Sequence, residues 1–137
     1  MGKIKIACET YTWQMPGESY KGKLDHIMGV VSAAGFAGIE PETSFFCDLS
    51  DPTKMKDTLA KHNLELSVLC HVEDWRNPKE TDKEKANAEK WMDFLSHFPD
   101  TIYLPVQMPG KDRSNLQERQ KNLLSCVNAL AERASAS

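Results

Sequence analysis

The sequence predicts an α/β fold in which four β-strands alternate with four α-helices and all strands run parallel. Short apolar runs alternate with longer segments whose apolar residues recur at helical spacing. Each strand–helix unit is roughly thirty to thirty-five residues long, which is the size of a βα unit. Such alternation is typical of a parallel sheet with right-handed crossovers. The whole chain, residues 1–137, is therefore expected to form a single domain.

The first strand is predicted at Ile4–Cys8, an apolar run flanked by lysines. Glu9 follows it directly, and Tyr11 and Trp13 lie in the connection that ends at the turn Pro16-Gly17. The two aromatic side chains are candidates for one wall of a ligand pocket. Packing beneath the strand ends is the alternative for both.

An amphipathic helix follows and is expected to end at Gly35, because glycine takes φ > 0 without a clash of a Cβ atom. The second strand, residues 38–40, comes at once and places Glu40 at its carboxyl end. Pro41 has no N–H group to donate, so the strand is expected to stop there. Glu42 is then expected outside the ring of strand ends, which leaves Glu40 as the candidate to contact a ligand.

The helix that follows the second strand is predicted at Pro52–His62, since proline suits the first helical position. The strand Leu64–Cys70 is nearly all apolar, as expected when both faces are buried. His71 and Trp75 follow this strand, so both are candidates for contact with a ligand. In the loop before the helix, the pair Phe45-Phe46 is expected either to cover the pocket or to form an interface.

The helix that follows the third strand is predicted to begin with a capping box formed by Thr81 and Glu84. The next strand starts near Thr101, and Pro105 is expected to shorten its pairing or to make it irregular. A last helix presents apolar residues between Leu116 and Ala134. The final residues are too small and polar to be expected in a packed element.

The composition argues against two classes of partner. The net charge is −3 and no basic run occurs, so we expect no nucleic acid partner. No apolar stretch approaches the ~20 residues of a membrane span, and the N-terminus lacks the apolar core of a signal peptide. We therefore expect a cytoplasmic protein with no membrane partner. Its four scattered cysteines, Cys8, Cys47, Cys70 and Cys126, are expected to be reduced.

The carboxyl ends of the strands distinguish two architectures that accept four βα units. An open doubly wound sheet usually has a glycine-rich phosphate loop, and neither G-x-G-x-x-G nor G-x-x-x-x-G-K-[ST] occurs here. Each predicted strand instead ends in polar or aromatic residues, which suits the mouth of a barrel. A complete (β/α)8 barrel takes about 250 residues. The chain is therefore predicted to be the first half of a TIM barrel, with the remaining strands and helices absent from it.

Three segments resemble the sugar-phosphate isomerase/epimerase superfamily, the xylose-isomerase-like group of TIM barrels. They are Lys3–Ala7, Ala33–Glu40 and Leu64–Val68. The second contains Gly-Phe-Ala-Gly-Ile-Glu, where family members often have Gly-aromatic-x-Gly-Ile-Glu. The resemblance extends over essentially the whole chain but covers only the first half of the family's barrel.

The resemblance implies that the complete barrel catalyses metal-assisted proton transfer next to the carbonyl of a sugar, a sugar phosphate or a related polyol. It also implies a divalent metal, Mn, Mg, Co or Zn, held mostly by residues that would follow Ser137. The metal would stabilise the developing enediolate charge while a carboxylate takes the proton. We assign no catalytic base in this chain and expect it to be inactive alone. Its expected contribution is substrate binding, by the following residues: Glu40, His71, Tyr11, Trp13 and Trp75.

Two alternatives stay open. A half barrel leaves two unpaired strand edges, so the chain is alternatively a non-catalytic binding or assembly module, and in either case a homo-oligomer is expected. The other alternative is a metal-dependent endonuclease of the same fold, whose family has a zinc-binding histidine at the place of His71. One histidine does not complete a zinc site. The family's His-Pro-Gly after the fourth strand is Met108-Pro109-Gly110 here, which counts against this alternative.

Overall fold

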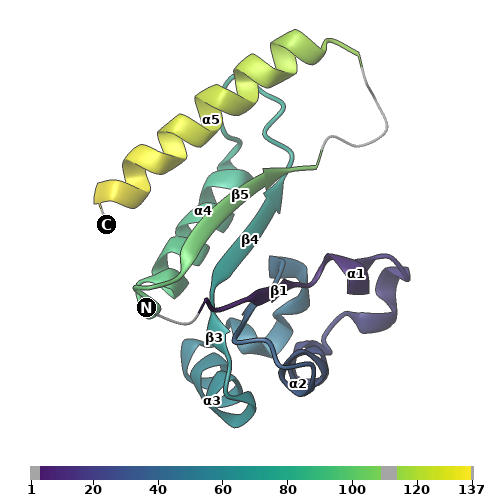
Figure 1. Ribbon diagram of the computed structural model, residues 1–137. Helices are drawn as coiled ribbons and strands as arrows, with labels where there is room; N and C mark the ends of the chain where they lie inside the picture. The colour runs from purple at the N-terminus through teal and green to yellow at the C-terminus, as the bar shows by residue number, and fades with distance from the viewer. Residues whose placement is uncertain (1–3, 109–113, 137) are drawn as a thin grey trace.

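The computed structural model describes residues 4–108 and 114–136 and has an α/β fold with parallel strands (Figure 1). The strands are β1 (Ala7–Glu9), β2 (Gly38–Glu40), β3 (Glu65–Leu66), β4 (Val68–Glu73) and β5 (Ile102–Gln107). The helices are α1 (Tyr11–Gln14), α2 (Leu24–Ala33), α3 (Pro52–His62), α4 (Asp82–Leu95) and α5 (Leu116–Ala136). The predicted α/β class is confirmed. The predicted turn at Pro109-Gly110 lies outside the described residues.

Strands β3 and β4 behave as one strand that changes partner along its length. In parallel pairs, β1 lies beside β2, β2 beside β3, and β4 beside β5. Ser67 separates β3 from β4; its N–H donates to Ile39 O at 3.0 Å, and its carbonyl accepts from Ile102 N at 3.1 Å. A parallel bridge between Glu42 and Cys70 continues the contact with the β2 segment. The strand order is therefore β1, β2, β3–β4, β5, which follows the chain as successive βα units do.

Gly38 allows the strands to approach closely at this change of partner. A Cβ atom built on Gly38 would lie 2.1 Å from Ser67 Oγ, 3.0 Å from Glu65 O and 3.4 Å from Ala7 Cβ. The first two distances are shorter than van der Waals contact allows. Gly35, three residues earlier, ends α2 with a φ of +85°, as the sequence predicts. The two glycines of the segment therefore serve different purposes.

Two apolar clusters fix the helices on one side of the strands. The larger one joins α2, α3 and α4 to the sheet and includes the following buried residues: Leu24, Ile27, Met28, Ile39, Phe45, Phe46, Met55, Leu69, Trp91 and Phe94. The smaller one consists of Trp75, Ala88 on α4, and Cys126 and Leu130 on α5. Phe45 and Phe46 are thus core residues, which corrects the expectation that they cover a pocket or form an interface. The ring centroids of Phe46 and Trp91 are 5.0 Å apart in an edge-to-face contact.

Pro105 does not shorten the fourth strand, contrary to the expectation from sequence. Strand β5 continues through Pro105 to Gln107, in register with β4. Backbone N–H groups on both sides of the proline, those of Ile102 and Met108, donate to the β4 strand and its extension. Because alternate residues of a strand bond to opposite sides, the Pro105 nitrogen faces away from β4, toward an edge that no strand of the described residues pairs with, and proline is tolerated there.

The last helix differs from its prediction at its end and on its apolar face. Helix α5 continues to Ala136, so it includes residues that we expected to lie in an unpacked tail. Its buried positions are Asn122, Cys126 and Leu130, spaced four residues apart. Leu124, which the sequence places on the apolar face, is exposed.

Replacing Gly38 with alanine is expected to lower the free energy of unfolding by about 1–3 kcal/mol, because the added methyl group overlaps Ser67 and strand backbone. Chemical denaturation followed by circular dichroism measures this change. The matched control is Gly29→Ala in α2, whose added Cβ would lie no closer than 3.4 Å to a neighbour, the His62 ring. Alanine is the better helix former, by ~1 kcal/mol, so the control should retain or gain stability. Equal stability of the two variants would contradict the close packing at Gly38.

Candidate functional site

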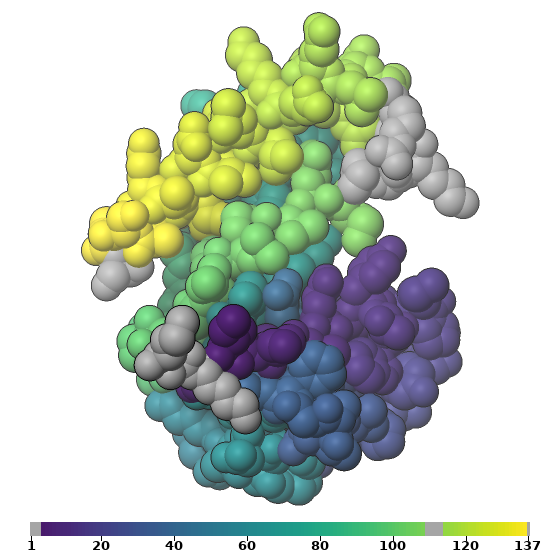
Figure 2. All heavy atoms as spheres, in the orientation of Figure 1, coloured from purple at the N-terminus to yellow at the C-terminus, as the bar shows by residue number. Residues whose placement is uncertain are grey.

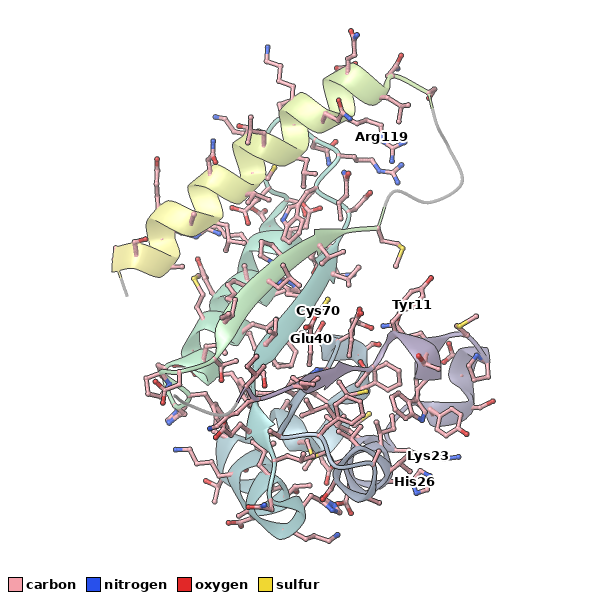
Figure 3. The ribbon with its side chains drawn as sticks, viewed as in Figure 1. Tyr11, Lys23, His26, Glu40, Cys70 and Arg119 are labelled. Atoms are coloured by element: carbon pink, nitrogen blue, oxygen red, sulfur yellow. The ribbon has the colours of Figure 1, made fainter. Side chains whose placement is uncertain are left out.

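A small cavity of about 110 Å³ lies where the carboxyl ends of β1 and β2 meet the inner sides of β4 and β5. Its polar lining comes from the β1 and β2 ends and includes Glu9, Glu40 and Glu42. Its apolar lining comes from β4 and β5 and includes the following residues: Val72, Leu104 and Val106. Figure 3 shows Glu40 and Cys70 together in the centre of the molecule, with Tyr11 beside them on α1. The cavity therefore has one acidic side and one apolar side.

A larger hollow of about 580 Å³ lies at the opposite ends of the strands. Its lining includes Lys5, the β3 residues, Ser67 and residues 97–101. These residues precede or begin their strands, so the hollow is at the amino end of the sheet. Ligands of parallel α/β folds gather at the carboxyl ends. We therefore place the candidate site at the smaller cavity.

The Glu42 carboxylate is fully occupied by bonds within the protein. It accepts hydrogen bonds from Ser44 N and Gln14 Nε2, each at 3.0 Å, and from Thr43 Oγ1 at 3.2 Å; the Ser44 hydroxyl donates to it as well. Its backbone N–H donates to Thr10 Oγ1 at 3.1 Å. Glu42 thus lies at the strand ends and joins the β1 and β2 connections. This corrects the expectation that Pro41 directs it outside them.

The Glu40 carboxylate lies on the same cavity but is not tied down. Across residues 4–108 and 114–136, no hydrogen bond holds the side chain of Glu40, and the same is true of Glu9, its direct partner in the β1–β2 ladder. Burial raises the pKa of the Glu40 carboxyl above its ordinary value, and the charge of Glu9 raises it further. A half-buried carboxylate beside a second one is suited to accept hydrogen bonds from a ligand.

The pKa of the Cys70 thiol is affected both by burial and by the glutamates of this cavity. Burial is the main cause that raises the pKa of its thiol to about 11, and the charges of Glu42, Glu40 and Glu9 add to the effect. The thiol is therefore protonated at neutral pH and is a poor nucleophile. Cys70 serves as a small apolar wall between the carboxylates and the β5 side chains. With Cys8, Cys47 and Cys126 it is a free thiol, as predicted.

The two candidate aromatic residues of the first connection have different surroundings. Tyr11 begins α1, lines the cavity and is well exposed, so its ring is open to a ligand. Trp13, two residues later, packs against the main apolar cluster. The structure thus brings Tyr11, but not Trp13, to the cavity of Glu40.

His71 and Trp75 lie on the helix side of β4, away from this cavity. Cys70 lines the cavity, and successive strand residues point to opposite faces. His71 is accordingly buried; its Nδ1 is 2.6 Å from Tyr103 Oη and its Nε2 is 3.4 Å from Glu73 Oε1. Trp75 is fully buried between α4 and α5. The expected contact of these two residues with a ligand therefore receives no support from the cavity at Glu40.

Glu84 holds the Trp75 turn in place from within the helix side. Its carboxylate accepts from Trp75 N and Thr81 N, each at 2.7 Å, while Glu84 N donates to Thr81 Oγ1 at 3.2 Å. The predicted capping box is therefore confirmed. The extra bond to Trp75 N explains how a residue with a φ of +41° is held there, since left-handed backbone is costly for a tryptophan.

The described residues do not fit the divalent metal that the resemblance implies. Among them, no three side chains of histidine, cysteine, aspartate or glutamate are placed to hold a metal ion. The three glutamates of the cavity do not form such a group, and His71 points to Tyr103 and Glu73. We therefore derive no reaction step through a metal. In the same part of the chain, no helix is both long and apolar enough to cross a membrane.

The chain matches no protein-family model and no curated protein. The resemblance of residues 33–40 to sugar isomerases and epimerases therefore stays a prediction. The structure adds a physical role for each member of that segment. Gly35 ends α2, Gly38 permits close strand contact, and Glu40 ends β2 inside the cavity.

Sequence reasoning missed several residues that build the site. Thr10 is buried and ties the two strand ends together, because its N–H donates to Glu40 O at 3.1 Å and its hydroxyl accepts from Glu42 N. Gln14 orients Glu42, and Cys70 forms the floor between the acidic and apolar sides. The signal for Thr10 was its place directly after Glu9, at a strand end. No local pattern marks Gln14 or Cys70.

His71 is expected to make stability depend on pH near neutrality. Burial lowers the pKa of His71 below its ordinary value of 6.5, although the nearby Glu73 partly opposes this. As the pH falls, His71 of the unfolded chain therefore takes up a proton near pH 6.5, whereas His71 of the folded chain takes it up only at a lower pH. Stability is therefore complete above pH 6.5 and falls as the pH drops below it, by at most about 1.4 kcal/mol per pH unit.

Urea denaturation between pH 7.5 and 5 measures this dependence in the wild type and in His71→Gln. The variant should be less stable at pH 7.5 but should lose less stability on acidification. His26→Gln, on the exposed side of α2, is the control and should keep the wild-type slope. Parallel pH profiles for the wild type and His71→Gln would show that His71 does not resist protonation.

Proposed function

We propose that this chain provides the substrate-binding wall of an isomerase- or epimerase-like enzyme that acts on a sugar or related polyol. The observation that carries the proposal is the pair Glu40 and Glu9, whose carboxylates meet at the strand ends without side-chain hydrogen bonds in the described residues. Glu42, by contrast, is satisfied internally. Glu40 is the residue that accepts a hydrogen bond from a substrate hydroxyl.

The two-sided character of the cavity supports a sugar as the ligand. A sugar has hydroxyl groups that donate to carboxylates and C–H faces that pack on apolar and aromatic surfaces. Glu40 and Glu9 supply the acceptors, while Val72, Leu104 and the Tyr11 ring supply apolar contact. The volume of about 110 Å³ is below the ~300–1,000 Å³ of pockets that enclose a whole drug-sized ligand. It suits one wall of a site rather than a complete one.

The charge of the cavity favours a neutral polyol over a sugar phosphate at this wall. Three carboxylates line it, and within the described part of the chain none of its lining residues is a lysine or an arginine. Burial is the main cause of the raised pKa values of Glu40 and Cys70, and this excess of negative charge raises both pKa values further. A phosphate placed beside Glu40 would be repelled, because like charges in a partly desolvated site interact strongly.

The complete enzyme of this proposal transfers a proton next to the substrate carbonyl. A divalent metal, when bound by residues beyond this chain, would supply electrophilic stabilisation of the oxygens. The described residues bind and orient the substrate hydroxyls, and Cys70, Val72 and Leu104 form the apolar side of the cavity. None of them is assigned as the catalytic base.

A neutral ketose such as fructose is expected to bind this chain weakly and to shift the amide NMR signals of Glu40 and Tyr11. Fructose 6-phosphate should bind less well. Glu40→Gln should raise the dissociation constant about tenfold or more, since a hydrogen bond to a charged group contributes about 1.5–3 kcal/mol.

Glu89→Gln is the matched control for the binding measurement, because it makes the same chemical change on the exposed side of α4. It should bind fructose as the wild type does. Tighter binding of the phosphate, or equal effects of the two substitutions, would contradict the role of Glu40.

The complete barrel is expected to exchange the hydrogen next to the carbonyl of its ketose with deuterated water. Mass spectrometry of the recovered sugar detects the exchange, which is measured without metal and with added Mn²⁺, Mg²⁺, Co²⁺ or Zn²⁺. No exchange across a panel of ketoses with any of these metals would overturn isomerase or epimerase activity. It would leave the binding result untouched, so the two failures are distinguishable.

A further inference from the structure

We propose that Gln14 is a ligand-contacting residue of the cavity at Glu40 and that its side-chain amide forms hydrogen bonds with the polyol. This inference rests on the proposed function, because it adds a contact to the same wall. It also names the group that binds a ligand oxygen without a hydrogen, which an ionised carboxylate cannot do. Three features of Gln14 support it: its place on α1, the orientation of its amide, and the polar atoms that the amide leaves unbonded.

Helix α1 presents two of its residues to the cavity and one to the core. Tyr11 and Gln14 are three residues apart, which places them on one side of a helical turn, and both line the cavity. Trp13 packs against the main apolar cluster instead. Figure 2 shows the purple segment of β1 and α1 at the surface, with the green β5 segment above it. A ligand in the cavity therefore meets the Tyr11 ring and the Gln14 side chain on the same element.

The position of α1 is fixed by bonds to the strand ends. Thr10, the residue before the helix, donates through its N–H to Glu40 O at 3.1 Å, and its Oγ1 accepts from Glu42 N at 3.1 Å. Trp13 N donates to Thr10 O at 3.0 Å and so closes the first turn. A helix of four residues is not stable on its own. These bonds therefore place Gln14 relative to the strand that carries Glu40.

The Glu42 carboxylate determines which way the Gln14 amide faces. Gln14 Nε2 donates to Glu42 Oε2 at 3.0 Å. An ionised carboxylate accepts hydrogen bonds and donates none, so the opposite orientation of the amide would bring two acceptor oxygens together. The other hydrogen bonds to this carboxylate come from Ser44 and Thr43. The amide nitrogen is therefore held at Glu42, and Gln14 Oε1 is directed away from that carboxylate.

The Gln14 amide keeps polar atoms for a ligand. Within the part of the chain that the structure describes, Gln14 Oε1 accepts no hydrogen bond, and one bond, to Glu42, uses one of the two Nε2 hydrogens. The amide lies 3.0 Å from a carboxylate of the cavity lining, and Gln14 itself belongs to that lining. One acceptor and one donor of a half-buried side chain are thus left at the cavity.

These two atoms supply what the carboxylates of the cavity lack. Ionised Glu9 and Glu40 accept hydrogen bonds from ligand hydroxyls but have no hydrogen to donate. A ketose also carries a carbonyl or ring oxygen without a hydrogen. The second N–H of Gln14 donates to that oxygen, while Gln14 Oε1 accepts from a neighbouring hydroxyl. Gln14 is therefore a specificity-determining residue, because it sets which end of the polyol faces α1.

Binding of fructose and of its monodeoxy derivatives, followed by amide NMR titration of this chain, tests the contact. Gln14→Met keeps the length of the side chain but removes its donor and its acceptor. It should raise the dissociation constant of fructose about threefold to tenfold, which is the net effect of a hydrogen bond between uncharged groups. The derivative that lacks the hydroxyl bound by Gln14 should bind the wild type more weakly than fructose does. It should bind Gln14→Met as fructose does, because the partner of that hydroxyl is already absent.

Two control variants separate contact with the ligand from disturbance of the site. Ser44→Ala removes a different donor from Glu42, and Ser44 does not line the cavity, so this variant should bind fructose as the wild type does. Gln120→Met makes the same chemical change as Gln14→Met on the exposed side of α5 and should also bind normally.

The outcomes distinguish the contact of Gln14 from the proposed function. Unchanged binding by Gln14→Met, an equal loss in Ser44→Ala, or deoxy derivatives that all bind the wild type and Gln14→Met alike would overturn the contact. Each of these results would leave the role of Glu40 intact. Failure of the wild type to bind any ketose would instead overturn the proposed function together with this inference.

Discussion

The close approach of β2 to the β3–β4 strand is the constraint on which the rest of the structure depends. At Gly38 the strands come so near that no side chain fits between them, and Ser67 fills the space that a Cβ atom would take. Ser67 then bonds to β2 through its N–H and to β5 through its carbonyl. Ser67 thus marks the point at which the β3–β4 strand leaves β2 and begins to pair with β5. Because the strand is shared, the ends of β1, β2 and β4 converge on one cavity.

Glu40 and Glu42 have different roles because of this geometry. Pro41 separates Glu40 from Glu42, so both side chains are directed to the same side of the extended backbone, as residues i and i+2 of a strand are. Glu42 is taken up by Ser44, Thr43 and Gln14, and it holds the β1 and β2 connections together. Within the part of the chain that the structure describes, no hydrogen bond holds the Glu40 side chain, which is partly desolvated. Stability of the site and readiness to bind are therefore carried by different residues of the same type.

The elements of the fold could be predicted from sequence because their signals are local. The glycine that ends α2, the proline that begins α3 and the capping box of α4 each depend on a few neighbouring residues. Pro105 was misjudged because its effect depends on which side of β5 is paired, and that is a property of the sheet. Half of a TIM barrel stays a prediction, since four parallel strand positions do not by themselves determine closure.

The candidate site was less predictable because sequence order does not show which face of a strand a side chain occupies. His71 follows an apolar strand just as Glu40 does, yet it points to the helices while Cys70 points to the cavity. A shift of one residue along a strand moves a side chain from one face of the sheet to the other. Reasoning from strand ends alone therefore selected residues on both sides of the sheet. The hydrogen bond of His71 to Tyr103, thirty-two residues later in the chain, has no local signal at all.

The preference for a neutral ligand that we propose follows from the pairing of β1 with β2. The register of these strands places Glu9 beside Glu40, and burial together with the charge of Glu9 raises the pKa of the Glu40 carboxyl. A polyol that donates hydroxyl hydrogen bonds to these carboxylates would offset part of the cost of desolvating them, whereas a phosphate would add to it. The carboxylates at the ends of β1 and β2 thus connect strand pairing, which is a matter of backbone geometry, with the choice of a neutral ligand, which is a matter of charge.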